Sequence, residues 1–150
     1  MGKKYIYLTS IVLTMYCLTL SCAKKPTPSP TTTTSPGMSA TVGGIAWAET
    51  TLKVTNTNGV DTIAGLRASD TSTIMLLFPD GQNAGDTLKV GSINTIEYIK
   101  GNITYDAING SIIISSSANN TLKGTFTATV EDFNTSNKIT ITNGAFTAKF

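Results

Sequence analysis

The chain has 150 residues, with 11 Lys and Arg, 9 Asp and Glu, two cysteines and no histidine. The lack of histidine excludes the Ser/His and Cys/His arrangements of nucleophilic catalysis and removes a main zinc ligand. Lys3 and Lys4 account for the net charge of +2, so the rest of the chain gives no reason to expect nucleic-acid binding.

The first 21 residues have the pattern of an export signal. A short cationic start precedes sixteen uncharged, mostly apolar residues (5–20) and the small residue Ser21. This pattern predicts a signal peptide over residues 1–21. A transmembrane helix is the alternative, but it needs roughly 20 apolar residues. The run contains four Ser or Thr residues and ends at Cys22.

The segment Leu18-Thr19-Leu20-Ser21-Cys22 resembles the bacterial lipobox. Its last two residues match that pattern, whereas Thr19 and Leu20 depart from it. The resemblance implies that a diacylglyceryl group is attached to Cys22, that the chain is cut before it, and that the lipid holds the protein on a membrane. Cys17 leaves with the leader and Cys22 carries the lipid, so no thiol remains for a disulfide or a metal.

Residues 22–39 form a predicted tether. Four prolines lie among Thr and Ser residues, a composition that cannot bury a core and favours an extended chain. Lys24 and Lys25 lie close to the cysteine, after Ala23, and suit contact with anionic lipid headgroups. Surface lipoproteins of Bacteroidota often carry acidic residues at this place. We therefore expect a cell-envelope protein anchored in the outer membrane, on the periplasmic side rather than the cell surface.

Residues 40–150 are predicted to form one all-β domain. They contain nineteen threonines and many Ile, Val and aromatic residues, with Asn, Gly and Asp clusters at short intervals. The predicted fold is an antiparallel β-sandwich of about nine strands, and a lipocalin-like β-barrel is the alternative. The expected strands cover Ala40–Ala48, Thr50–Thr57, Val60–Ala68, Thr73–Phe78, Thr87–Val90, Thr95–Lys100, Asn102–Tyr105, Ser111–Ser116, Thr121–Glu131 and Lys138–Phe150.

Four turns are expected between these strands, at residues that tolerate positive φ. They are Asn58-Gly59, Pro79-Asp80-Gly81, Gly101-Asn102 and Asn109-Gly110. Alternatively, the sixth and seventh strands are one bent strand.

The last two strands allow a more detailed prediction. In Thr121–Glu131 apolar and polar residues alternate without a break, whereas the alternation in Lys138–Phe150 slips near Asn143-Gly144. Either a two-residue hairpin turn or a β-bulge at Thr142-Asn143 explains the slip.

The bulge is preferred because of where it places two glycines. When the hairpin closes with Glu131 opposite Lys138, one extra residue in the last strand pairs Phe126 with Gly144 and Gly124 with Phe146. Each aromatic ring then covers the glycine on the opposite strand.

Five segments resemble a family of small uncharacterised cell-envelope lipoproteins from Bacteroidota. They are Ala40–Ala48, Asn94–Tyr98, Gly110–Ile114, Leu122–Phe126 and Ile141–Phe146. The resemblance covers essentially the whole domain, and its marks are structural, such as Gly-x-Phe strands. It implies an all-β domain of unknown function and supplies no activity.

Carboxylates are the remaining candidates for chemistry. Glu97 and Glu131 are expected at solvent-facing strand positions. Six aspartates are expected in turns, where they cap backbone amides: Asp61, Asp70, Asp80, Asp86, Asp106 and Asp132. We therefore expect a protein that is not an enzyme and uses no cofactor. A carboxylate-dependent glycan hydrolase is the least favoured alternative.

The loop between the fourth and fifth expected strands has a weak calcium pattern. Asp80, Asn83 and Asp86 have oxygen side chains at a suitable spacing, but the loop lacks the closing bidentate Glu of a calcium site. A plain hairpin loop is the preferred interpretation, so no metal is expected.

Two short motifs resemble the O-glycosylation sites of Bacteroidota. Asp61-Thr62-Ile63 and Asp86-Thr87-Leu88 have the Asp-Thr-aliphatic order. Thr62 and Thr87 are therefore candidate glycosylation sites, with a chance match as the alternative because threonine is common in strands.

Three aromatic residues, Trp47, Tyr98 and Tyr105, are candidates for a binding cleft. Trp47 is the only tryptophan and lies in a predicted strand, so a buried core position is preferred for it. The two tyrosines are expected on or near the buried face, with their hydroxyls reaching water.

The predicted function is that of a lipid-anchored, non-catalytic envelope protein of unknown specific role, which acts as a binding or structural module for protein or glycan. The alternative is a lipocalin-like binder of a small apolar ligand, which requires an apolar cavity of roughly several hundred Å³. Two carboxylates that converge in a cleft would instead indicate the hydrolase.

Overall fold

Ten antiparallel strands make up the fold in the computed structural model, which describes residues 36–150. They are β1 (Gly37–Val42), β2 (Ile45–Ala48), β3 (Thr51–Thr57), β4 (Val60–Arg67), β5 (Ser72–Pro79), β6 (Thr87–Lys89), β7 (Thr95–Lys100), β8 (Ile103–Ala118), β9 (Thr121–Asp132) and β10 (Asn137–Lys149). The part of the chain that the structure describes contains no helix. The all-β, antiparallel class predicted from the strand-forming composition is confirmed.

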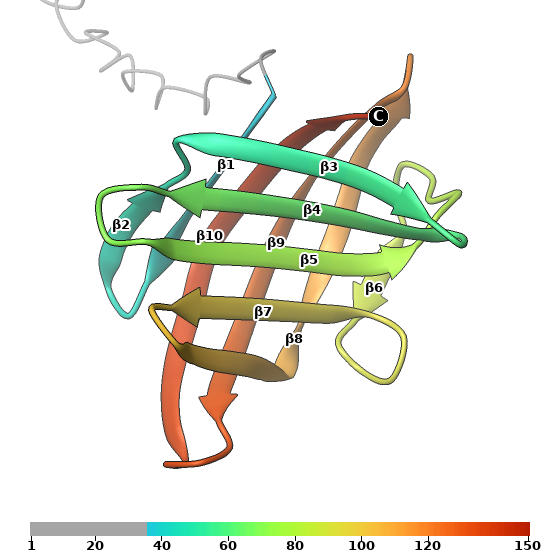
Figure 1. Ribbon diagram of the computed structural model, residues 1–150. Coiled ribbons are helices and arrows are strands. Elements are labelled where there is room, and N and C mark those ends of the chain that lie inside the picture. The colour runs from blue at the N-terminus through green and yellow to red at the C-terminus, as the bar shows by residue number, and fades with distance from the viewer. Residues whose placement is uncertain (1–35) are drawn as a thin grey trace, which may run out of the picture. The chain divides into compact units, whose positions relative to one another are not determined.

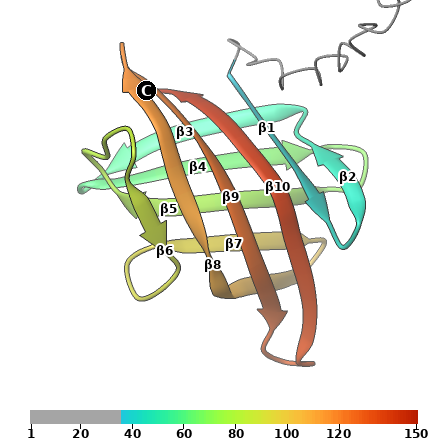
Figure 2. The same cartoon turned by 180° about the vertical axis from the view of Figure 1, so that it is seen from behind.

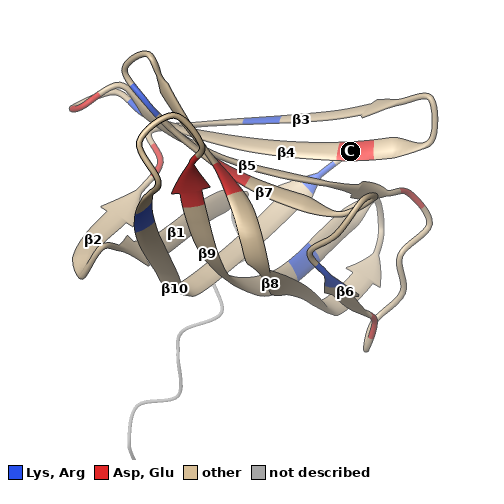
Figure 3. Cartoon of the chain, turned by 90° about the horizontal axis from the view of Figure 1, so that it is seen from below, with Lys and Arg blue, Asp and Glu red and all other residues tan. Residues whose placement is uncertain are grey.

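The strands form one continuous sheet in the order β2-β1-β10-β9-β8-β7-β5-β4-β3, with β6 paired to β8. This sheet curls into a half-barrel, so that β3, β4, β5 and β7 cross over β1, β10, β9 and β8 (Figure 1, Figure 2). Figure 3 shows the two layers facing each other. β8 joins the layers, because its first residues pair with β7 of one layer while most of its length pairs with β9 of the other. The domain therefore has two facing layers made from a single sheet.

The predicted strand Ala40–Ala48 is two strands, β1 and β2. Gly43 and Gly44 have φ values of +56° and +83°, in the left-handed region that glycine adopts readily. They form a hairpin in which Val42 pairs with Ile45. A single strand is wrong here because two consecutive glycines permit both positive φ values that a two-residue hairpin turn needs.

The region 102–118 also differs from the prediction. Asn102–Tyr105 and Ser111–Ser116 belong to one long strand, β8, and Gly101, with φ of +60°, separates β8 from β7. The predicted turn at Asn109-Gly110 and the bent-strand alternative are both wrong. The chain continues through Gly110 because β9 pairs along almost the whole of β8, with register shifts at two bulges. A Cβ at Gly110 would lie 2.3 Å from a β9 carbonyl oxygen, so only glycine permits this approach.

The bulge predicted near the end of the chain is confirmed. β9 and β10 pair Ala128 with Ile141 and then Phe126 with Gly144, which leaves two residues of β10 opposite one of β9. Asn143, within the bulge, has a positive φ of 52°.

The predicted cover of glycines by aromatic rings is confirmed as well. Gly124 pairs with Phe146, and Gly144 pairs with Phe126. A Cβ built on Gly124 would lie 2.7 Å from the Phe146 ring, and one built on Gly144 would lie 2.6 Å from the Phe126 ring. Each ring thus occupies the volume that a side chain on the opposite strand would need.

Apolar side chains fill the space between the two layers. The largest of them are almost completely buried: Trp47, Phe78, Phe126, Ile63, Ile74, Leu76, Ile96, Ile112, Ile114, Ile141 and Val130. This packing leaves the middle of the half-barrel as a solid core. Pockets lie at the ends of the half-barrel and on an outer face of the sheet.

Candidate functional site

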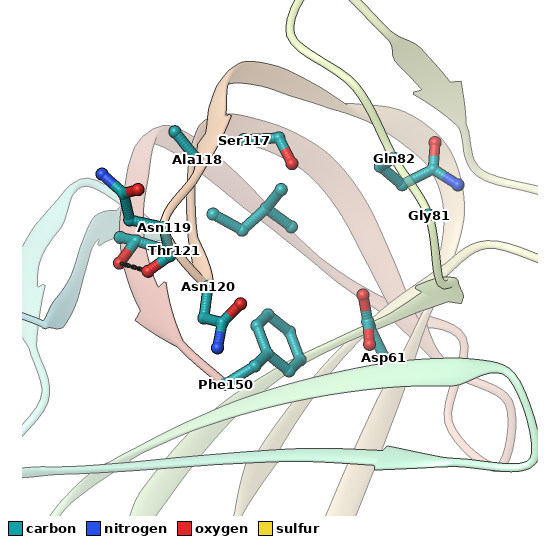
Figure 4. Close-up of a pocket in the computed structure, with 10 residues that line it drawn as sticks. Asp61, Gly81, Gln82, Ser117, Ala118, Asn119, Asn120, Thr121 and Phe150 are labelled. Atoms are coloured by element: carbon teal, nitrogen blue, oxygen red, sulfur yellow. Dashed lines mark hydrogen bonds between the residues drawn. The ribbon is translucent and has the colours of Figure 1, made fainter.

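A polar pocket of about 320 Å³ lies at one end of the half-barrel (Figure 4). The start of β4, the loop after β5 and the β8–β9 hairpin surround it, and the residue after β10 completes it. Its lining residues are Asp61, Gly81, Gln82, Ser117, Ala118, Asn119, Asn120, Thr121, Leu122 and Phe150. We refer to it as the Asp61 pocket.

Asp61 is the one acidic residue of the pocket lining. It lies on the inward face of β4, because every second residue of a strand points to the same side and the next two on this side, Ile63 and Gly65, are buried. Its exposed fraction is only 7%, and Asn56 Nδ2 on β3 donates a hydrogen bond to its Oδ1 at 2.7 Å. The core row of β4 therefore ends in a carboxylate at the pocket.

Three influences act on the pKa of Asp61. Burial raises it most, the hydrogen bond from Asn56 lowers it, and the nearby Asp80 carboxylate raises it further. Asn56 Nδ2 also lies 3.3 Å from Asp80 Oδ2, so one amide bridges the two acids. The pocket lining contains no Lys or Arg, and the net result is a raised pKa.

Neutral polar groups and one aromatic ring form the other walls. Ser117 and Asn120 come from the β8–β9 hairpin (Figure 4). Gln82 lies across from them on the loop after β5, where its Nε2 donates to the Pro79 carbonyl at 2.9 Å. The Phe150 backbone N–H donates to the Asn120 carbonyl at 2.9 Å, which holds the Phe150 ring beside the pocket. Leu122 adds an apolar patch.

Local turn geometry positions this hairpin wall. Asn119 and Asn120 both have positive φ, 52° and 55°, and they connect the paired residues Ala118 and Thr121. Two consecutive positive φ values match the hairpin twist of antiparallel strands, and Asn tolerates them better than most residues. An Asn-Asn turn thus places one amide side chain at the pocket.

The chemistry that this arrangement supports is hydrogen bonding. A glycoside hydrolase places two carboxyl groups on either side of the bond that it cleaves. Here one carboxylate side chain, that of Asp61, lines the pocket, and its neighbour Asp80 lies outside the lining. The pocket therefore has the groups to hold a polar ligand.

The expectation that all six aspartates lie in turns is wrong for three of them. Asp61 and Asp106 lie inside β4 and β8, and Asp132 is the last residue of β9. Asp132 does cap a turn, since it accepts hydrogen bonds from Asn134 N and Thr135 Oγ1 at 2.9 and 2.6 Å. These bonds lower its pKa. Asp61 lies two residues before the apolar Ile63, which is the spacing of residues on one face of a strand. This spacing is the sequence signal that distinguishes Asp61 from the aspartates in turns.

Glu97 and Glu131 lie on the outer face of their strands and are half-buried. Glu97 pairs with Asp106, and Asp106 pairs with Glu131. Burial, and secondarily the Asp106 charge, raise the pKa of Glu97. Lys138 Nζ lies 3.5 Å from Glu131 Oε2 and balances one end of this acidic row.

The residues of the calcium pattern are not brought together as one ligand set. Asp86 Oδ2 accepts a hydrogen bond from Asn83 N at 2.7 Å, inside the loop, whereas Asp80 Oδ2 lies near Asn56. In residues 36–150 no three His, Cys, Asp or Glu side chains are grouped as metal ligands.

The two candidate glycosylation sites differ in accessibility. Thr87 is exposed on β6, beside a shallow pocket on the outer face of β8–β10. Thr62 is half-buried in the middle of β4, which has strands on both sides. Cys22, the predicted lipid attachment site, lies outside the described residues.

Trp47 is a core residue, as preferred from the sequence. It is 2% exposed, and its Nε1 donates to Ser72 Oγ at 2.8 Å. Ser72 Oγ donates in turn to Asp70 at 2.6 Å, and Asp70 is paired with Arg67. The hydrogen bonds from Arg67 and then Ser72 hold the pKa of Asp70 well below its usual range.

The tyrosines do not line the Asp61 pocket. Tyr98 is buried, Tyr105 is half-buried, and their ring centroids lie 5.9 Å apart. They pair across β7 and β8 and so stabilise the junction between the layers.

Comparison with known proteins gives a family but no characterised relative. Within residues 36–150 the structure shows no helix that is long and apolar enough to span a membrane. No curated protein and no solved structure gives a significant match. One family model matches residues 34–148, a range that includes all ten strands except Lys149, the last residue of β10. The chain therefore belongs to the family described as a domain of unknown function, DUF6252.

Proposed function

We propose that this chain is a lipid-anchored, non-catalytic cell-envelope protein that binds a glycan or protein partner through the Asp61 pocket. The buried Asp61 carboxylate at a pocket of about 320 Å³ is the observation that carries the binding function. Small-ligand sites have volumes of about 300–1,000 Å³ and a few convergent polar groups. This pocket has both properties.

The anchoring part of the proposal comes from the leader and tether. The segment 18–22 resembles a lipobox, and the Pro/Thr-rich residues after it suit a spacer between the membrane and the domain. Lys24 and Lys25 in place of acidic residues favour the periplasmic side of the outer membrane.

The geometry favours binding over the two alternatives. The filled core between the layers gives no support to a lipocalin-like binder of an apolar ligand. Because a single carboxylate side chain lines the pocket, the paired Asp or Glu residues of a glycan hydrolase are not provided there.

Anchoring is tested by growing cells with a clickable fatty acid and isolating the full-length protein. We expect label on the wild-type chain and none on Cys22→Ala, together with membrane fractionation of the wild type only. Label that persists in the Cys22→Ala variant would contradict lipid attachment at this residue.

Binding is tested with the mature protein immobilised and exposed to separate glycan and protein fractions of the native envelope. Wild type and Asp80→Asn are expected to retain the same component, and Asp61→Asn to lose it. Asp80→Asn is the matched control, because it removes a neighbouring charge without changing the pocket lining. Equal retention by all three proteins, or none by the wild type, would exclude this pocket as the binding site.

A further inference from the structure

We propose that the Asp61 pocket takes a neutral saccharide, whose hydroxyl groups donate to Asp61 and whose ring packs against Phe150. This inference rests on the proposed binding function of the same pocket and goes further by naming the chemical class of the ligand.

The charge of the pocket restricts the ligand first. Asp61 has the one charged side chain among the ten residues that line it. An anionic ligand would therefore meet a carboxylate without a cation to balance it. The ligand must be neutral or cationic.

The acceptor capacity of Asp61 comes next. A carboxylate has about four acceptor positions, and Asn56 Nδ2 occupies one of them at 2.7 Å. A buried carboxylate is stabilised by further donors. The vicinal hydroxyl groups of a sugar supply two donors at adjacent positions, which suits the two oxygens of a carboxylate.

The opposite wall favours a sugar over an ammonium group. Ser117, Asn120 and Gln82 carry hydroxyl or amide groups (Figure 4), which as a set both donate and accept hydrogen bonds. Gln82 Nε2 already donates to the Pro79 carbonyl at 2.9 Å, so Asn120 is the amide whose N–H groups need an acceptor. Sugar hydroxyls both donate and accept, whereas an ammonium group only donates and leaves the Asn120 N–H groups without an acceptor.

The Phe150 ring gives the last requirement. Phe150 is 42% exposed, so part of the ring is available at the pocket, and Leu122 adds a second apolar surface. An aromatic side chain offers a large, rigid apolar surface. A pyranose ring has an apolar C–H face beside its hydroxyls, so one molecule can satisfy both kinds of wall.

The test is a titration of the ¹⁵N-labelled mature protein with a panel of small molecules, followed by NMR. The panel contains neutral mono- and disaccharides, a uronic acid, and lysine as a cationic probe. We expect saturable shifts with at least one neutral saccharide, which include the side-chain amide signals of Asn120 and Gln82. The uronic acid and lysine are expected to give no saturable shift.

Two pairs of variants locate the binding. Asp61→Asn is expected to weaken saccharide binding about tenfold or more, since hydrogen bonds to charged groups contribute about 1.5–3 kcal/mol. Asp80→Asn should bind like the wild type. Phe150→Ala should bind more weakly than Phe133→Ala, which removes an exposed phenyl ring outside the Asp61 pocket.

Each contrary result has a defined meaning. Saturable binding of lysine alone, no response to any neutral saccharide up to its solubility, or saccharide binding unchanged by Asp61→Asn overturns the saccharide inference. If the envelope retention experiment still depends on Asp61 in that case, the binding function survives and its ligand class is different. Loss of both results removes the binding function too.

Discussion

The middle and one end of the half-barrel differ in how the space between the two layers is filled. In the middle, the rings of Phe126 and Phe146 occupy the space above Gly144 and Gly124, and the interior is filled. At the end, the inward row of β4 stops at Asp61, and a pocket remains between polar side chains. The middle is thus built for stability, whereas the end keeps a carboxylate where its burial is unfavourable.

The strongest test of the filled middle is Phe126→Ala. Phe126 is 1% exposed, so we expect its loss to lower the free energy of unfolding by about 3–5 kcal/mol. Urea denaturation of the purified mature protein measures this change. Phe133→Ala, at a ring that is 66% exposed, is the control and should change stability little. Equal effects for both rings would contradict the tightly packed middle.

A smaller effect is expected at the polar contact within the core. Trp47→Phe removes the hydrogen bond to Ser72 Oγ, and we expect a loss of about 1–3 kcal/mol because buried polar groups lose a partner. Ser72→Ala should have a similar cost, and the double variant should cost less than the sum of the two. Thermal unfolding of the three variants measures the coupling, and strict additivity would show that the bond contributes nothing.

At the pocket we expect a substitution to raise the free energy of unfolding rather than lower it. Asp61→Asn keeps an acceptor for Asn56 and removes a buried charge, so stability at pH 7 should rise by up to about 1 kcal/mol. The pKa of Asp61 is raised in the folded state, so the folded protein binds its proton more tightly than the unfolded chain does. The penalty therefore develops as the pH rises from 3.8, the ordinary pKa, through the folded value, and is absent below this range.

Denaturation of wild type and Asp61→Asn at several pH values checks this sign. The stability difference between the two should be largest at neutral pH and shrink as the pH falls toward 4. A difference that grows on acidification would mean that the Asp61 carboxylate stabilises the fold, contrary to its burial.

The smallest effect is expected on the outer face beside Phe126. Thr127 lies next to it in β9 and is exposed. Thr127→Ala should change the free energy of unfolding by less than about 0.5 kcal/mol, measured in the same urea experiment as Phe126→Ala. A cost similar to that of Phe126→Ala would show that this face is covered.

Asn-Gly pairs show how far local sequence predicts this fold. Asn58-Gly59 is a turn, with φ values of 54° and 77°, whereas Asn143-Gly144 lies at a bulge and Asn109-Gly110 inside β8. In each case the dipeptide indicates that the backbone tolerates a positive φ. Which structure results depends on the strand that pairs with it, and that partner is a non-local property.

The register of β9 against β10 was predictable because a long alternation and a complementary set of rings and glycines leave one arrangement that buries both. The strand-forming composition likewise determined the all-β class, and the signal-like leader determined the expectation of a lipid anchor. The curling of one sheet over itself was determined by the tertiary structure and not by the local sequence. It depends on strand pairing, because β8 changes its partner from β7 to β6 along its length. Asp61 was expected in a turn, but it is a buried carboxylate beside a pocket. The curl of the sheet explains this, because the β8–β9 hairpin forms part of the pocket wall only once the sheet has curled.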